Sequence, residues 1–270
     1  MRIAIVAPGR RLPETTAERL TALARDAAPE AELVIHPQCF ESHGHFAGPD
    51  AARAGALVEM ANDPAVDAIW FARGGYGAGR IAGDVIARLE APARAKTYLG
   101  YSDCGFLLAA LYKAGIGTVA HGPVANDLVR AGGEAAAIRA MAFLATRDAA
   151  SLEASDPPGA RRAAFNLTVL AHLCGTDLLP DLSGHVLLLE EVSEPLYRID
   201  RAFCQLAGTD WFGRLAGLRL GRVSDIVPND IDFAMTAEEI AKHWCARAGI
   251  AYLGPADIGH DAGNKVVVFG

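Results

Sequence analysis

The stretch TYLGYSDCGFLLAALYKAGIGTVAH, residues 97–121, is the clearest indication of the fold of this chain. It begins with a short β-like run, Thr97–Gly100, turns at Ser102 and continues as an apolar helical segment, Phe106–Ala114. A second β-like run, Thr118–His121, follows at once. Because a strand, a helix and another strand in close succession form a crossover unit, this stretch predicts two parallel strands of one sheet.

The same alternation extends back to the N-terminus. Strands are expected at Ile3–Ala7, Glu32–His36 and Ala68–Ala72, and helices at Thr15–Ala28, Asp50–Asn62 and about Gly79–Leu89. The pattern predicts an α/β fold with a doubly wound, flavodoxin-like parallel sheet that has helices on both faces. Ligands of such sheets bind beyond the carboxyl ends of the strands, where the loops at Gly74 and Ser102 fall.

The pattern changes after about residue 126. A helical stretch, Gly133–Thr146, leads to Pro157–Gly159, which is typical of an exposed loop. Beyond it, helices are expected at Leu167–Cys174, Leu196–Ala207 and Thr236–Ala248, and strands at Val186–Leu189, Leu218–Val223 and Val266–Phe269. We therefore expect an N-terminal α/β domain over residues 1–125, a linker region over 126–160 and a smaller C-terminal α/β domain over 161–270.

Composition narrows the class of protein. The 270 residues are 51% hydrophobic, enough for a sizeable core, and the net charge of −7 without a basic run argues against nucleic-acid binding. The apolar run Ile3–Pro8 is too short for a signal peptide, and no apolar stretch reaches the roughly 20 residues that cross a bilayer. A cytoplasmic protein with no membrane partner is expected. The five scattered cysteines, with no CxxC pair, favour reduced thiols over disulfides or a metal site.

Ser102 is the first candidate for chemistry. It stands in Gly100-Tyr101-Ser102-Asp103, between a strand and a helix, which is typical of the nucleophile elbow of hydrolases. That elbow usually has glycine two positions after the serine, and Cys104 stands there instead. A helix cap is the alternative role for this serine, and the motif alone leaves both open.

Three further segments could act with Ser102. The run RGGYGAGR, residues 73–80, allows close backbone approach at Gly74 and Gly75, and we interpret it as an oxyanion- or carboxylate-binding loop rather than a flexible turn. Glu190 and Glu191 follow an apolar strand, where a solvated strand end is the alternative. His260 lies in a Gly-rich loop before the last strand, and such loops often carry functional groups.

Together these segments resemble the LD-carboxypeptidase family of serine peptidases, with its muramoyl-tetrapeptide and microcin-immunity branches. The matching pieces, in order, are Ala7-Pro8, Phe46-Ala47-Gly48, Arg73-Gly74-Gly75-Tyr76-Gly77, Gly100-Tyr101-Ser102-Asp103, Gly122-Pro123, Asn166-Leu167, Leu189-Glu190-Glu191 with Glu194, Tyr197-Arg198-Ile199-Asp200-Arg201 and Gly259-His260. They cover most of the chain.

The resemblance implies a role for each residue. Ser102 would be the nucleophile, His260 the base and Glu190 the group that orients the histidine. The N–H groups of Asp103 and of the Gly74–Gly75 turn would bind the oxyanion. The resemblance also implies a homodimer, with the serine in the first domain and its two partners in the second. No metal and no other cofactor is expected.

Three functions follow as hypotheses. The first is a carboxypeptidase that releases terminal D-alanine from a cytoplasmic murein tetrapeptide during peptidoglycan recycling. The second is a related hydrolase of a peptidyl-nucleotide or another modified peptide. The third is a catalytically silent peptide-binding protein that uses the same cleft.

Overall fold

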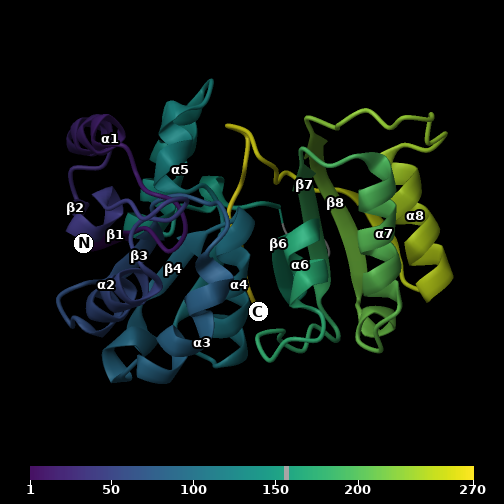
Figure 1. Cartoon of the computed structure of the whole chain (residues 1–270), viewed down its shortest axis with the longest axis horizontal. Helices are drawn as coiled ribbons and strands as arrows, with labels where there is room; N and C mark the ends of the chain where they lie inside the picture. Colours follow the sequence, from purple (N-terminus) through teal and green to yellow (C-terminus); the bar gives the residue numbers. More distant parts are fainter. Residues whose placement is uncertain (155–157) are drawn as a thin grey trace.

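A computed structural model of the chain describes residues 1–154 and 158–270 and contains two β-sheets that lie side by side (Figure 1). The strands of the first sheet, in spatial order, are β2 (Glu32–Ile35), β1 (Arg2–Val6), β3 (Ala68–Phe71), β4 (Thr97–Gly100), β5 (Thr118–His121) and β10 (Val267–Val268). The order of its first five strands is the flavodoxin-like 2-1-3-4-5, and these five are parallel. The predicted doubly wound sheet is confirmed.

Helices cover both faces of the first sheet. They are α1 (Glu14–Ala27), α2 (Asp50–Asn62), α3 (Ala78–Arg88), α4 (Gly105–Lys113) and α5 (Gly133–Thr146). The apolar side chains of α1 and α5 pack in one core cluster, and those of α2, α3 and α4 pack in another. Strands that are covered on both faces must be apolar throughout, and β3 and β4 are buried at every residue.

The second sheet has four parallel strands. In spatial order they are β6 (Arg162–Asn166), β7 (Val186–Val192), β8 (Gly217–Ser224) and β9 (Tyr252–Pro255), joined by α6 (Leu167–Leu173), α7 (Leu196–Ala207) and α8 (Ala237–Ala248). Helix α8 begins where the sequence expects it because Thr236 caps it. The Thr236 hydroxyl accepts from the N–H of Glu239, whose carboxylate accepts from the N–H of Thr236 in return.

The final segment of the chain crosses back to the first sheet. Strand β10 lies antiparallel to β5, with Val267 opposite His121, so the chain ends in the sheet in which it began. In Figure 1 this segment runs in yellow from the second sheet to the first. It matters for function because His260 lies on it.

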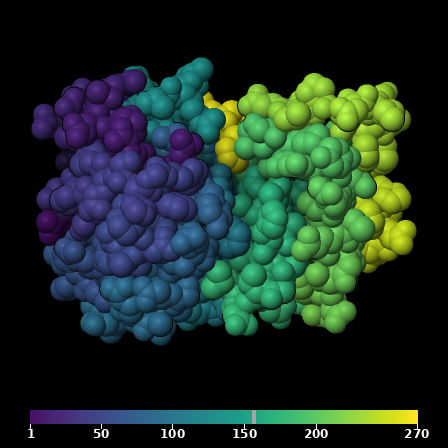
Figure 2. Space-filling view, viewed as in Figure 1, coloured from purple at the N-terminus to yellow at the C-terminus, as the bar shows by residue number. Residues whose placement is uncertain are grey.

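Apolar packing joins the two halves, which touch along a broad boundary in the space-filling view (Figure 2). Helices α4 and α6 pack together there, and a Cβ atom at Gly105 would lie 3.0 Å from Val169. The ring of Phe165, 1% exposed, meets that of Phe269 edge to face at 5.2 Å between centroids. One core cluster therefore continues from the first half into the second.

Two strands, β6 and β9, are not among those predicted, and a third, β7, is longer than predicted. Strand β7 continues through Glu190 and Glu191 to Val192, whereas the apolar run predicts an end at Leu189. Pro157 of the expected exposed loop lies outside the described residues. In the part of the chain that the structure describes, no helix is both long and apolar enough to cross a membrane.

The boundary between the halves predicts a stability effect. Phe165→Ala should lower the free energy of unfolding by about 3–5 kcal/mol, because it removes a buried ring and leaves a cavity. Ile231→Ala, at a side chain 83% exposed, is the control and should change it by less than about 0.5 kcal/mol. Chemical denaturation followed by circular dichroism measures both, and equal effects of the two substitutions would contradict this packing.

Candidate active site

Ser102 lies in the tight turn between β4 and α4. Its φ of 59° is in the left-handed region, which costs a residue with a side chain roughly 1–2 kcal/mol. Glycines make room for this turn. A Cβ atom at Gly100 would come within 2.5 Å of the Phe71 ring, and one at Gly74 would lie 3.2 Å from the Ser102 hydroxyl oxygen. A strained serine between a strand and a helix is the geometry of a nucleophile elbow.

Glu190 and Glu191 lie near the end of β7, where its pairing with β8 shifts in register, and they bind different partners. Glu191 serves the fold: its carboxylate accepts from Asn166 Nδ2 at 2.7 Å and from the N–H of Thr168 at 2.8 Å, at the start of α6. Glu190 is completely buried, and its Oε2 atom lies 2.5 Å from Nδ1 of His260. The solvated strand end that was the alternative is therefore wrong for both acids.

His260 is held from several sides. Its ring lies on that of Tyr101, with 4.7 Å between centroids, and its carbonyl oxygen accepts from Arg130 Nη1 at 2.9 Å. A hydrogen bond also holds the loop around it, since the N–H of the preceding residue, Gly259, donates to Oδ1 of the buried Asn264 at 3.2 Å. Because Nδ1 is engaged by Glu190, the other ring nitrogen, Nε2, is the one available to a substrate or to Ser102.

Burial and charge act against each other at this pair. Burial opposes the charged imidazolium, but the Glu190 carboxylate outweighs it by attraction and by the hydrogen bond, so the pKa of His260 is raised. Burial raises the pKa of Glu190, and the imidazolium limits that rise. Burial also lowers the pKa of the neighbouring His121 to about 3, which keeps that ring neutral. His260 is thus the basic imidazole of the site.

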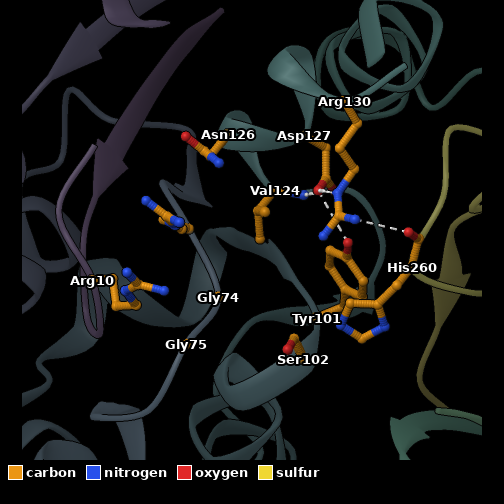
Figure 3. A pocket seen from close by; sticks show the side chains of 11 residues that line it. Arg10, Gly74, Gly75, Tyr101, Ser102, Val124, Asn126, Asp127, Arg130 and His260 are labelled. Carbon is orange, nitrogen blue, oxygen red and sulfur yellow. Dashed lines mark hydrogen bonds and ion pairs between the residues drawn. The ribbon is translucent and has the colours of Figure 1, made fainter. Parts of the chain in front are cut away.

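Ser102 and His260 line one cavity of about 340 Å³, shown from close by in Figure 3. Gly74 and Gly75 form part of its wall. The chain therefore brings Ser102, Glu190 and His260 to one place. In residues 1–154 and 158–270, no hydrogen bond joins the Ser102 hydroxyl to the imidazole, and such contacts are often loose before substrate binds.

Asp103 follows Ser102 in the turn that begins the helix. The first N–H groups of a helix have no partner within it, so the N–H of Asp103 is available to an anion. Burial raises the pKa of the Asp103 carboxyl. The backbone N–H of Asp103 could therefore bind an oxyanion, and this role would not involve its side chain.

Sequence reasoning missed four polar residues of the cavity: Arg10, Asn126, Asp127 and Arg130. Their positions in the chain could have identified them as residues of the site, because Arg10 follows β1 and the other three follow β5. The carboxyl ends of neighbouring parallel strands meet at one edge. Among the described residues, no group of three or more His, Cys, Asp and Glu side chains is arranged to hold a metal ion.

The electrostatics of the pair give a test that needs no substrate. Glu190→Gln should lower the pKa of His260, since the carboxylate that favours the imidazolium is gone while the burial that opposes it remains. The ring of His260 would then take up its proton at lower pH than in the unsubstituted protein, as measured by NMR titration. Glu194→Gln, at a partly exposed acid that pairs with Arg198, is the control. An unchanged or raised His260 pKa in Glu190→Gln would refute the coupling.

Comparison with family models finds matches over most of the chain. Residues 3–122 match the N-terminal domain of LD-carboxypeptidases, and residues 162–270 match the C-terminal domain of the same family. The chain is similar to a putative carboxypeptidase of Streptomyces coelicolor, with 32% identity over 286 residues that cover 100% of this chain and 88% of the relative. It is 28% identical to the murein tetrapeptide carboxypeptidase of Pseudomonas aeruginosa, covering 100% of this chain and 91% of that protein.

Solved structures agree with this match. The muramoyltetrapeptide carboxypeptidase from Oxalobacter formigenes superposes with a TM-score of 0.82 at 26% identity, over 99% of this chain and 93% of that one. The microcin C7 self-immunity protein has the same fold, with a TM-score of 0.79 at 16% identity over 100% and 91% of the two chains. From its sequence and its fold, the chain therefore belongs to the LD-carboxypeptidase family and is a serine-type carboxypeptidase, a hydrolase.

Proposed function

We propose that this enzyme hydrolyses the amide between an L-centre and the terminal D-alanine of a murein tetrapeptide, with Ser102, His260 and Glu190 as its catalytic triad. The 2.5 Å contact between His260 and Glu190, at the cavity that Ser102 also lines, is the observation that carries the proposal. The similarity to murein tetrapeptide carboxypeptidases supports the substrate.

In the first step, the Ser102 oxygen attacks the amide carbonyl and its proton passes to Nε2 of His260. A free serine is a poor nucleophile at neutral pH, and the raised pKa of His260 makes that ring a stronger proton acceptor. Glu190 holds the Nδ1–H tautomer and stabilises the imidazolium that forms. Because Glu190 is buried, water does not compete for this contact.

The carbonyl oxygen becomes an oxyanion that needs hydrogen-bond donors. The N–H of Asp103, which follows Ser102, and one N–H of the Gly74–Gly75 turn, which lies beside the Ser102 hydroxyl, are the proposed donors. Loss of one such donor usually costs roughly 3 kcal/mol, or a hundredfold or more in rate.

The carbon–nitrogen bond then breaks, and the imidazolium gives its proton to the departing amine of D-alanine. Water, activated by the same ring, attacks the ester on Ser102. The shortened peptide leaves with a new carboxylate, and the serine recovers its proton. This sequence consumes one water per amide and needs no other reactant.

We place this reaction in the cytoplasm, on fragments of recycled peptidoglycan, and expect the enzyme to act as a homodimer. Cell fractionation checks the compartment. Sedimentation equilibrium should give twice the chain mass of 28.3 kDa. A single-chain mass at micromolar concentration, or activity confined to an extracytoplasmic fraction, would count against these two parts of the proposal.

A modified peptide, such as a peptidyl-nucleotide, is the alternative substrate. The likeness to the microcin immunity protein, at 16% identity, supports the fold alone. Incubation with murein tetrapeptide and with an aminoacyl-sulfamoyl nucleotide in parallel separates the two, and release of D-alanine from the tetrapeptide alone is the expected outcome.

Substitutions test the triad. Ser102→Ala and His260→Ala should each lower kcat on the tetrapeptide by roughly 10⁴-fold or more, because each removes a group that every turnover uses. Circular dichroism should show both variants folded. His172→Ala is a matched control, since His172 is an exposed histidine on α6. Near-normal release of D-alanine by folded Ser102→Ala would eliminate Ser102 as the nucleophile.

A further inference from the structure

Two arginines line the cavity beside the nucleophile and form no ion pair with an acid among the residues that the structure describes. Arg53, Arg80 and Arg130 each pair with an aspartate. By contrast, no ion pair joins Arg10 or Arg73 to a carboxylate in the described parts of the chain, and both line the cavity of Ser102 and His260. The arginine pair, Arg10 and Arg73, thus provides two guanidinium groups for which the protein itself supplies no counter-charge there.

The Gly74–Gly75 turn beside Ser102 connects this pair to the reacting group. Arg73 directly precedes Gly74, whose Cβ position is 3.2 Å from the Ser102 hydroxyl oxygen. The side chain of Arg10 lies across Gly75, the residue after Gly74, since a Cβ atom at Gly75 would lie 2.5 Å from Arg10 Cδ. In Figure 3, Arg10, Gly75 and Gly74 follow one another toward Ser102.

A buried arginine holds the two loops together. Arg53 is completely buried and donates to the carbonyl oxygen of Pro8, on the loop of Arg10, and to that of Gly77, at 2.9 Å, on the loop of Arg73. Asp50 neutralises it. The backbones of the two loops are therefore held together before any ligand binds, and a site whose loops are held in advance binds at a lower entropy cost.

The charges around the cavity favour an anion. Burial, and then repulsion from the guanidinium groups of Arg10 and Arg130, lowers the pKa of Arg73. Arg130 on the far wall is neutralised by Asp127, with 2.7 Å between Nε and Oδ1. A carboxylate between Arg10 and Arg73 would relieve that repulsion and could accept paired hydrogen bonds from a planar guanidinium.

We propose that Arg10 and Arg73 bind the α-carboxylate of the C-terminal residue that the enzyme releases, and so restrict cleavage to the last amide of the peptide. This inference rests on the proposed function. The α-carboxylate is two bonds from the leaving nitrogen, so it must lie close to Ser102 in any reactive pose. Carboxylates of the acyl part lie a residue or more away, about 3.8 Å of chain per residue.

The first test compares the murein tetrapeptide with its C-terminal carboxamide. The enzyme should cleave the acid with a kcat/KM at least tenfold above that for the amide, because the amide has no charge for the arginine pair. Arg10→Ala and Arg73→Ala should each lower kcat/KM for the acid by roughly 10–100-fold, mainly through KM, and leave the amide almost unchanged. Arg10→Lys should retain part of the preference for the acid over the amide, since lysine keeps the positive charge but lacks the paired N–H donors of a guanidinium.

Arg11→Ala is the matched control. Arg11 is the next residue in the chain and lines a different cavity, so its loss should leave both substrates unaffected. Equal cleavage of acid and amide by the unsubstituted enzyme would overturn the proposal. An equal loss on both substrates in Arg10→Ala and Arg73→Ala would do so as well, since it would mean that the arginines support the fold or the chemistry rather than the carboxylate.

Binding to Ser102→Ala separates failure of this inference from failure of the proposed function. Calorimetry should find the intact tetrapeptide bound at least tenfold more tightly than its carboxamide, and this difference should vanish in Ser102→Ala/Arg10→Ala. Discrimination in binding without any hydrolysis by the unsubstituted enzyme would remove the proposed reaction and keep the carboxylate site. Equal binding of the two peptides, or binding of neither, would remove the carboxylate site whether or not hydrolysis occurs.

Discussion

The contact between Glu190 and His260 is the interaction on which the site depends. A carboxylate that is completely buried is stable only with a partner, and His260 is the partner that this fold supplies. The same contact selects which ring nitrogen faces the cavity and raises the pKa of the ring. The orientation of the His260 ring and its raised pKa therefore both come from this one contact.

That contact is possible because the end of the chain returns to the first sheet. Glu190 is on β7 of the second sheet, while Ser102 stands at the end of β4 in the first. The segment that carries His260 leaves the second sheet after β9 and ends as β10 beside β5. Arg130, on the first half, holds the His260 carbonyl oxygen as the segment passes. Continuous packing from Phe165 to Phe269 then keeps the serine and the histidine at one cavity.

The acidic groups of this site and the arginine pair lie on different walls of the cavity. Glu190 and Asp127 each have a cationic or imidazole partner on the side of His260. Arg10 lies beside the Gly74–Gly75 turn and Arg73 directly precedes it, and the described residues form no ion pair with either. A substrate with a terminal carboxylate fits this division, because its charge and its reacting carbonyl would meet different walls. The arrangement would combine the chemistry of a serine hydrolase with selection of the C-terminal residue of the peptide substrate.

The sequence by itself determined the doubly wound sheet, the turn at Ser102 and the Gly-rich loops, because buried strands and tight turns leave local patterns in composition. It also singled out Ser102, Glu190 and His260 as candidates, through short motifs and their resemblance to a family. Three features could be found only in the folded molecule: β10 joins the first sheet, Glu191 binds the start of α6 while Glu190 contacts His260, and Arg10 lies across Gly75. These are contacts between residues far apart in the chain, and they depend on how the two sheets pack, which no local pattern encodes.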